Sequence, residues 1–304
     1  MIVRTACQAM GTRFEFALIG DASDARDQSR LRAVAQLLAD EVVRLDAQLS
    51  LFRSDSLVAH VRRLPSGSVV RLDDELTSLF ADALAVWRDS AGCFDFTLGH
   101  MKRGVDPRGA GPETMEFDPA GRTLRLGGAR PTDLDFGAIA KGHALDIVAG
   151  LLREHGVQNA FVHGGTSSVL AMGAPPGRDG WTVQVRGMST DLSITLCDEA
   201  LSVSAQKSAG ESACNRTHIV DPRTASSCAE GRCAVIIGPS ARGADAWSTA
   251  ALVQGARPAL LPTQYTCLVE CPGTPWKISG PHAVSELSRA LHPAETPSME
   301  LETV

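Results

Sequence analysis

Lysine is rare in this sequence, and long apolar runs are missing. Only four of the 304 residues are lysine, although Lys and Arg together number 29, so a lysine in an apolar segment is notable. No apolar stretch approaches the ~20 residues that a helix needs to cross a bilayer. With a net charge of −6 and a pI of about 5.8, the chain lacks the basic surface that nucleic-acid binding requires, and we expect no nucleic-acid partner.

Targeting and metal-binding signatures are also missing. The first residues lack the continuous apolar centre of a signal peptide. The eight cysteines form no C-x-x-C pair, so the spacing of a zinc site is absent. Scattered unpaired thiols are typical of a reducing compartment. We therefore expect a cytoplasmic protein.

The apolar periodicity predicts more strands than helices. We expect helices over 31–49, 73–87, 139–155 and 241–254, and a loop over 106–119. Strands are expected over 14–18, 69–72, 122–126, 160–163, 168–172, 181–186, 192–197, 200–204, 217–220, 233–238 and 265–270. The regular strand–helix alternation of a doubly wound sheet is missing. The pattern predicts an α+β fold with mixed, largely antiparallel sheets and flanking helices. We expect one domain over 1–290, with two intertwined subdomains as an alternative, and a loosely held tail over 291–304.

A Gly-rich turn opens the helix expected over 139–155. The segment runs from Asp135 to Asp146 and contains Lys141. Free N–H groups at such a turn can receive a phosphate, and the lysine would add a positive charge. The alternative is an ordinary capped helix with a snorkelling lysine, because such turns are common.

A carboxylate and a hydroxyl share one face of the helix expected over 241–254. Asp245 and Thr249 stand at i and i+4, which lie on the same face of a helix. Together they would make a hard oxygen site that suits Mg²⁺. The alternative is an exposed first-turn carboxylate and a threonine that bonds to its own helix. If Asp245 is exposed, its removal should leave the fold intact.

Two further segments allow two interpretations each. His218, in the run Thr217 to Pro222, is either a proton acceptor near neutral pH or a partly buried structural histidine. The pair Gly164-Gly165 follows an expected strand and indicates either a close backbone approach or a tight turn.

Ordered motifs from residue 10 to about residue 255 resemble those of the ApbE family, the FAD:protein FMN transferases. Each motif alone is weak, but their order makes chance a poor explanation. They are Met10-Gly11-Thr12, Ser50 to Ser54, Gly92 to Asp95, Asp135 to Asp146, Gly164-Gly165 with Gly173, His218 to Pro222, and Ala244-Asp245 with Thr249.

The resemblance implies a substrate, a metal and a reaction. Such enzymes transfer the FMN part of FAD to a Thr or Ser hydroxyl of a target flavoprotein and release AMP. His218 would take the proton of the acceptor hydroxyl, and Lys141 would offset phosphate charge. FAD would lie across Met10, Phe52, Cys93, Phe94, Asp95, Asp135, Lys141 and Ile219, and its binding would depend on Asp135 and Phe94. Mg²⁺ would be held by the carbonyl of Ala138 with Asp245, Thr249 and Ser248.

Three segments depart from the family pattern. His60 stands where the family usually has Asn, Phe94-Asp95-Phe96-Thr97 replaces Phe-Asp-Pro-Thr, and Ser204-Ala205-Gln206-Lys207 replaces a Ser-Gly-Asp-Tyr-Glu-Arg run. Two alternatives therefore stay open. One is a protein that binds FAD without transferring FMN, and the other is a pyrophosphatase that yields FMN and AMP.

Overall fold

The computed structural model describes residues 1–21, 23–102, 111–129, 131–206, 219–287 and 299–301. The helices are α1 (Ala25–Leu49), α2 (Leu57–Arg63), α3 (Asp74–Asp89), α4 (Gly99–Lys102), the 3₁₀ helix η1 (Pro112–Thr114), α5 (Ala140–Glu154) and α6 (Ala241–Gln254). The strands are β1 (Ile2–Ala9), β2 (Thr12–Ile19), β3 (Val69–Arg71), β4 (Glu116–Asp118), β5 (Thr123–Arg125), β6 (Asn159–Gly164), β7 (Ser168–Met172), β8 (Trp181–Val185), β9 (Asp191–Leu196), β10 (Glu199–Ala205), β11 (Val220–Asp221), β12 (Ser226–Ser227), β13 (Cys233–Gly238), β14 (Thr266–Glu270), β15 (Lys277–Ser279), β16 (Ser285–Leu287) and β17 (Met299–Leu301).

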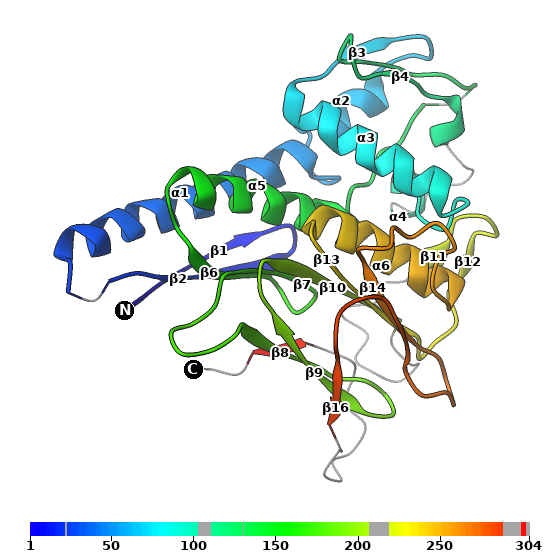
Figure 1. Ribbon diagram of the computed structural model, residues 1–304. Coiled ribbons are helices and arrows are strands. Elements are labelled where there is room, and N and C mark those ends of the chain that lie inside the picture. Colours follow the sequence, from blue (N-terminus) through cyan, green and yellow to red (C-terminus); the bar gives the residue numbers. More distant parts are fainter. Residues whose placement is uncertain (22, 103–110, 130, 207–218, 288–298, 302–304) are drawn as a thin grey trace.

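An eight-stranded sheet in the order β1-β2-β6-β7-β10-β13-β14-β15 forms the centre of the molecule. Helices α1, α5 and α6 lie across one face, and a four-stranded sheet in the order β16-β9-β8-β17 lies beneath the other (Figure 1). The strand pairs of both sheets are antiparallel. This architecture confirms the predicted α+β class with mixed, largely antiparallel sheets and flanking helices.

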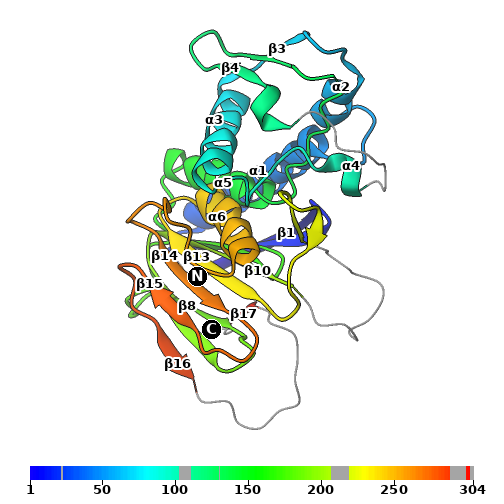
Figure 2. The ribbon, with the colours of Figure 1, turned by 90° about the vertical axis from the view of Figure 1, so that its right-hand side faces the viewer.

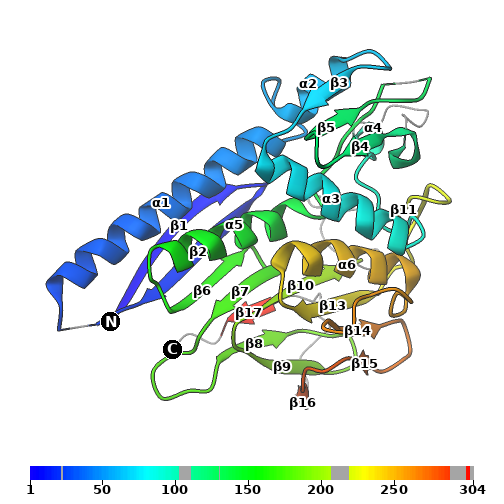
Figure 3. The ribbon, with the colours of Figure 1, turned by 45° about the horizontal axis from the view of Figure 1, so that its top comes forward.

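A smaller group of elements lies beyond the helical layer. Helices α2 and α3 and the three-stranded sheet β3-β5-β4 stand on the side of α5 and α6 that faces away from the large sheet (Figures 2 and 3). Their apolar residues join those of α6 in one core that includes Phe80, Phe136 and Trp247. Phe80 and Phe136 meet edge to face, with ring centroids 5.5 Å apart, an arrangement that aromatic pairs prefer. The two parts of the chain therefore share a core across α6.

Local sequence explains why the long helices form where they do. Helix α1 starts at Asp24, whose side chain accepts the Arg26 N–H, as an N-cap aspartate commonly does. One side of α1 is buried at every third or fourth residue, at Leu31, Val34, Leu38, Val42, Leu45 and Leu49. Helix α6 starts after the N-cap Ser240 and ends at Gly255 in the left-handed conformation, with φ 68°, the usual C-terminal stop. Its bounds are those predicted from the sequence.

Several elements were not predicted. Strand β1 pairs with β2 over its whole length, from Ile2 opposite Ile19 to Ala9 opposite Thr12. The two-residue turn between them is Met10-Gly11, both with positive φ (51° and 71°), as a tight hairpin requires. The loop expected over 106–119 is wrong where the structure describes it, because η1 and β4 lie there. Helices α2 and α4 and strands β12, β15, β16 and β17 were also missed.

The C-terminal residues that the structure describes belong to the second sheet. The described part of the expected tail forms β17, which pairs with β8, and the division into one domain over 1–290 stays a prediction. Within the described ranges, no helix combines the length and the apolar character needed to cross a bilayer.

Candidate functional site

Asp245 on α6 is the centre of a buried polar site. Only 4% of the residue is exposed. Its Oδ2 accepts the Gly142 N–H at 3.0 Å, and its Oδ1 accepts the Ser202 hydroxyl at 2.9 Å. Lys141 Nζ lies 3.5 Å from the same Oδ1. The carboxylate therefore joins the Gly-rich motif of α5 to the motif of α6. The interpretation of Asp245 as an exposed first-turn carboxylate is wrong.

Hydroxyl groups from three elements surround this carboxylate. Ser248 Oγ lies 2.8 Å from Ser204 Oγ and 3.3 Å from Ser202 Oγ, and Thr249 Oγ1 lies 3.4 Å from Ser204 Oγ. Ser168 Oγ donates to Asp245 Oδ1 at 3.3 Å. We call these residues of β7, β10 and α6 the hydroxyl cluster: Ser168, Ser202, Ser204, Ser248 and Thr249. The sequence analysis singled out Ser248 and Thr249 but missed the three strand serines as site residues.

The start of α5 leaves one carbonyl oxygen without a backbone donor. Ile139 precedes the helix with φ −146° and ψ −20°, outside the helical range. The Gly142 N–H would donate to the Ala138 carbonyl in a regular helix, but it donates to Asp245. Among the described residues, no backbone N–H donates to the Ala138 carbonyl. That oxygen is therefore available to a ligand, as the predicted metal site requires.

Two residues of the α5 motif fix the position of α6. Asp146 accepts the Ser240 hydroxyl at 2.7 Å and the Ala241 N–H at 2.7 Å, so it binds the positive end of α6. A Cβ at Gly142 would clash with the Ala241 carbonyl, so only glycine permits this helix contact. Sequence spacing had not indicated that these two residues position Asp245.

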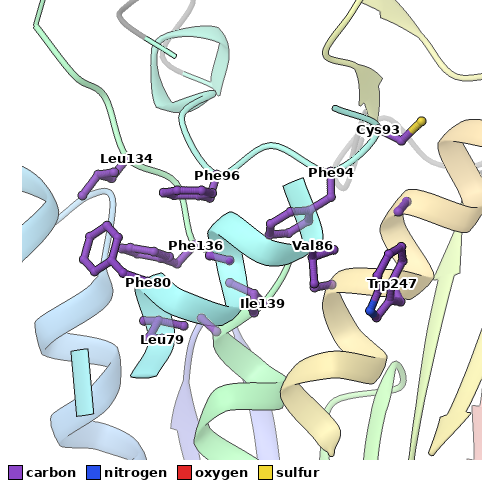
Figure 4. Packing of buried hydrophobic residues seen from close by; sticks show 14 of the residues in the cluster. Leu79, Phe80, Val86, Cys93, Phe94, Phe96, Leu134, Phe136, Ile139 and Trp247 are labelled. Carbon is purple, nitrogen blue, oxygen red and sulfur yellow. The ribbon is translucent and has the colours of Figure 1, made fainter. Parts of the chain in front are cut away.

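Cys93 and Phe94 lie inside the protein. Their exposed fractions are 1% and 0%, and burial raises the pKa of the Cys93 thiol. Figure 4 shows Phe94 among the side chains of the core, with its ring stacked on Phe96 at a centroid distance of 6.3 Å. Phe94 thus belongs to the core, and its part in FAD binding stays a prediction. Its main contacts are with the core.

Phe52 has the opposite environment. It is 84% exposed, the highest value among the large apolar residues that the structure describes as exposed. It follows the end of α1, where its N–H donates to Ser50 Oγ at 3.2 Å. Met10, at the β1–β2 turn, is partly buried and packs against both apolar clusters of the helical layer. Phe52 is thus the predicted flavin residue with a free aromatic face.

Asp95 and Asp135 lie on two segments that are bonded to each other. The Asp135 N–H donates to the Phe96 carbonyl at 2.7 Å, and the Asp135 Oδ1 accepts the Gly137 N–H at 2.9 Å. Asp95 Oδ1 accepts both the N–H and the hydroxyl of Thr97 at 2.7 Å. Burial raises the pKa of the Asp95 carboxyl. The motifs at 92–95 and 135–146 are therefore neighbours in the fold.

The motif at 218–222 is only partly described. His218, the predicted proton acceptor, lies outside the described residues, as does Lys207. The Ile219 N–H donates to Gln206 Oε1 at 3.1 Å, and Asp221 pairs with Arg223 at 2.7 Å. A Cβ at Gly92 would lie 3.8 Å from the Arg223 side chain, which places the end of this motif beside the Gly92 to Asp95 motif.

The structure also places the glycine pair and two of the segments that depart from the family pattern. Gly165 has φ +64°, and a Cβ there would clash with Thr12, so the glycine pair makes both a turn and a close approach to the Met-Gly-Thr motif. His60 is exposed on α2. Ser204, part of the departing run at 204–207, belongs to the hydroxyl cluster and therefore lies beside the predicted metal ligands.

The donor set at Asp245 fits Mg²⁺. It offers one carboxylate, a carbonyl oxygen without a backbone donor and several hydroxyls, all of them oxygen ligands, which this ion prefers. Within the described ranges, this site included, no group of three or more His, Cys, Asp and Glu residues could hold a metal. The residues predicted for Mg²⁺ are thus brought together, although their role as ligands stays a prediction.

The comparisons with known proteins agree with the ordered motifs. A sequence model of the ApbE family matches residues 10–266. The chain belongs to the ApbE family. A search of curated proteins gives no match.

Solved structures of ApbE proteins share this fold. The ApbE protein of Thermotoga maritima is 21% identical with a TM-score of 0.75, and 92% of this chain and 97% of that chain are covered. The flavinyl transferase ApbE of Pseudomonas stutzeri is 23% identical with a TM-score of 0.74, covering 92% and 94%. The flavin transferase ApbE of Vibrio cholerae is 19% identical with a TM-score of 0.73, covering 92% and 96%.

Proposed function

We propose that this ApbE protein is a flavin transferase that uses FAD as the donor. The FMN part of FAD would pass to a Thr or Ser hydroxyl of a target flavoprotein, and AMP would leave. The observation that carries the proposal is the joining of Lys141, Asp245 and the hydroxyl cluster at one buried position. Family membership supports it, as do similar structures that are named flavin or flavinyl transferases.

Mg²⁺ would be held by the Ala138 carbonyl, Asp245, Thr249 and Ser248. When bound, the ion would neutralise charge on the pyrophosphate, the main need of phosphoryl transfer. Ser202 and Ser168 donate to Asp245 Oδ1, so they hold the carboxylate in one orientation. Lys141, with a side chain 19% exposed, would contact the phosphate oxygens from the start of α5.

The proposed transfer needs only FAD and the acceptor hydroxyl as reactants. The acceptor hydroxyl oxygen would bond to the FMN-side phosphorus, and the bond from that phosphorus to the bridging oxygen would break. The bridging oxygen would leave with AMP. His218 would take the proton of the acceptor hydroxyl, a role that suits an imidazole near neutral pH. Phe52 would stack on the flavin ring, because its face is open.

Intact-mass analysis with FAD, Mg²⁺ and a candidate acceptor domain tests the proposal. We expect the acceptor to gain the mass of FMN, and we expect no gain when its Thr or Ser is replaced by Val or Ala. AMP should form in step with the modified acceptor. Free FMN and AMP that form equally fast without the acceptor would instead support the pyrophosphatase, and FAD that is bound but unchanged would support the storage protein.

The departing run at 204–207 bears on these two alternatives. Ser204 Oγ contacts Ser248 Oγ at 2.8 Å, so the run begins beside the predicted metal ligands with the serine that it shares with the family pattern. The replaced residues, from Ala205 to Lys207, are the feature of the sequence that favours these alternatives. The cytoplasmic location stays a prediction that fractionation of cells expressing the native protein tests.

A further inference from the structure

A cavity lies on the opposite face of the large sheet from Asp245. Its volume is about 590 Å³, within the ~300–1,000 Å³ typical of small-molecule sites. Residues on β1, β2, β6 and β8 line it. Side chains alternate across a strand, so Phe161 and His163 of β6 face the cavity while Val162 packs toward the helices. The cavity is therefore separate from the proposed flavin site.

The second sheet explains why this space exists. Its core residues pack mainly on β6, β7, β10, β13 and β14. Strands β1 and β2, at one end of the large sheet, lie beyond that contact (Figure 3). The cavity lies between the face of β1 and β2 that points away from α1 and the residues at the start of β8.

Aromatic side chains form one wall of the cavity. The Trp181 and Phe161 ring centroids are 5.3 Å apart, and those of Phe161 and His163 are 6.4 Å apart. The Trp181 Nε1–H donates to the Met172 carbonyl at 3.1 Å, which fixes the indole. A rigid aromatic wall of this kind favours planar ligands.

Positive charge dominates the polar part of the lining. Three arginines and one acidic residue border the cavity, and Arg13 pairs with that acid, Glu15, at 2.8 Å. Arg4 and Arg178 have no ion-pair partner within the part of the chain that the structure describes. His163 Nδ1 donates to the Gly165 carbonyl at 2.9 Å. Its buried Nε2 makes no hydrogen bond among the described residues, but it lies 3.5 Å from Glu15 Oε2.

We propose that this cavity binds a small planar aromatic ligand with an anionic group, such as a phosphate or a carboxylate. The ring would lie against Trp181 and Phe161. The anion would be bound by Arg4 and Arg178, because arginine suits both groups through paired hydrogen bonds. The inference does not depend on the proposed transfer reaction, since it uses none of that site's residues.

Isothermal titration calorimetry of the full chain tests this site. The probes are 1-naphthyl phosphate, 1-naphthoate, the neutral 1-naphthalenemethanol and inorganic phosphate. We expect at least one aromatic anion to bind roughly tenfold tighter than the neutral ring and than phosphate alone. The aromatic anion that binds with the higher affinity, 1-naphthyl phosphate or 1-naphthoate, identifies the preferred anionic group. Equal affinities of the charged and neutral aromatic probes would overturn the proposal.

Matched variants locate the binding. The double variant Arg4→Gln/Arg178→Gln should weaken binding of the aromatic anion roughly tenfold, and it should fold, because both side chains are exposed. Arg153→Gln, an exposed arginine on α5 outside the cavity, should bind like the parent. Lys141→Met should also retain the affinity. Loss of binding in Lys141→Met, with parent-like binding in the double variant, would place the probe in the flavin site and refute the cavity.

Discussion

Replacement of Asp245 by Asn is the sharpest test of the metal site. The change removes the charge but keeps the shape of the side chain. Asn can still accept the Gly142 N–H with its oxygen, and its amide can donate to Ser202, because a hydroxyl also accepts. Lys141, 3.5 Å from Asp245 Oδ1, loses its counter-charge. We expect the free energy of unfolding to fall by about 1–2 kcal/mol.

Asp245→Ala should lower the free energy of unfolding more than Asp245→Asn does. This differs from the expectation for an exposed carboxylate, whose removal would leave the fold intact. It leaves the Gly142 N–H and the Ser202 hydroxyl without their acceptor. Loss of one partner of a buried ion pair costs ~3–5 kcal/mol, and partial exposure of Lys141 brings this toward about 3 kcal/mol. At ~2–4 °C per kcal/mol in a chain of this size class, Tm should fall by about 6–12 °C. Asn is therefore the variant with which to measure activity.

The assay is FAD turnover against Mg²⁺ concentration, with thermal unfolding measured on the same samples. Asp245→Asn should lose at least ~100-fold in kcat, the scale of a lost electrostatic contribution at the transition state. Thr249→Val should show a milder loss. Glu270→Gln is the matched control, because Glu270 is also fully buried and accepts the N–H groups of Met188 and Ser189 at 2.6 Å. It should lose stability and keep its Mg²⁺ dependence. Folded Asp245→Asn with parent-like turnover and Mg²⁺ dependence would refute the metal site.

Three further predictions separate binding, packing and acid stability. Phe52→Ala should leave Tm within about 1 °C, because the ring is exposed, and weaken FAD binding roughly tenfold; unchanged affinity in a fluorescence titration would remove the ring from the flavin site. Phe94→Ala should lower the free energy of unfolding by ~3–5 kcal/mol in denaturant titration, and a cost below 1 kcal/mol would contradict its place in the core. His143, with Nε2 3.9 Å away, and Arg44 lower the pKa of Glu75 to about 2. The ionised carboxylate thus adds stability above its unfolded pKa near 4.5. As the pH falls from 4.5 toward 2, about 1–2 kcal/mol should be lost, because solvent screens this partly exposed carboxylate, and Glu75→Gln should flatten that slope in acid unfolding experiments.

Helix α6 shows why some elements can be predicted to the residue. It starts after the N-cap Ser240 and ends at Gly255, which has positive φ. Both bounds can therefore be predicted from the local sequence. Strand β1 was missed for the opposite reason. Its outward positions carry Arg4, Ala6 and Gln8, and only the pairing with β2 along the register makes it a strand. The pairing depends on contacts between two segments, and the pattern of apolar residues within one segment does not predict it.

Some residues of the candidate site could likewise be predicted from the sequence, and others could not. The predicted metal ligands on α6 could be proposed from the spacing of Asp245 and Thr249, since a helix places i and i+4 on one face. The strand serines could not be found so, because Ser202 and Ser168 belong to separate strands and reach Asp245 only through packing. One signal was available. A helix that is small and apolar on most sides is buried all round, and the alanines around Asp245 already indicated burial.

The motif from Asp135 to Asp146 and the motif Ala244-Asp245 with Thr249 are parts of one structural unit. They lie about a hundred residues apart, with Gly142 bonded to Asp245 at a separation of 103 residues. Asp146 caps α6 through Ser240 and Ala241, and the absence of a side chain at Gly142 lets the two helices meet. The same N–H that bonds to Asp245 is thereby withdrawn from the Ala138 carbonyl. One hydrogen bond thus orients the carboxylate and frees the carbonyl, which explains physically why both motifs are needed to build one oxygen-lined site.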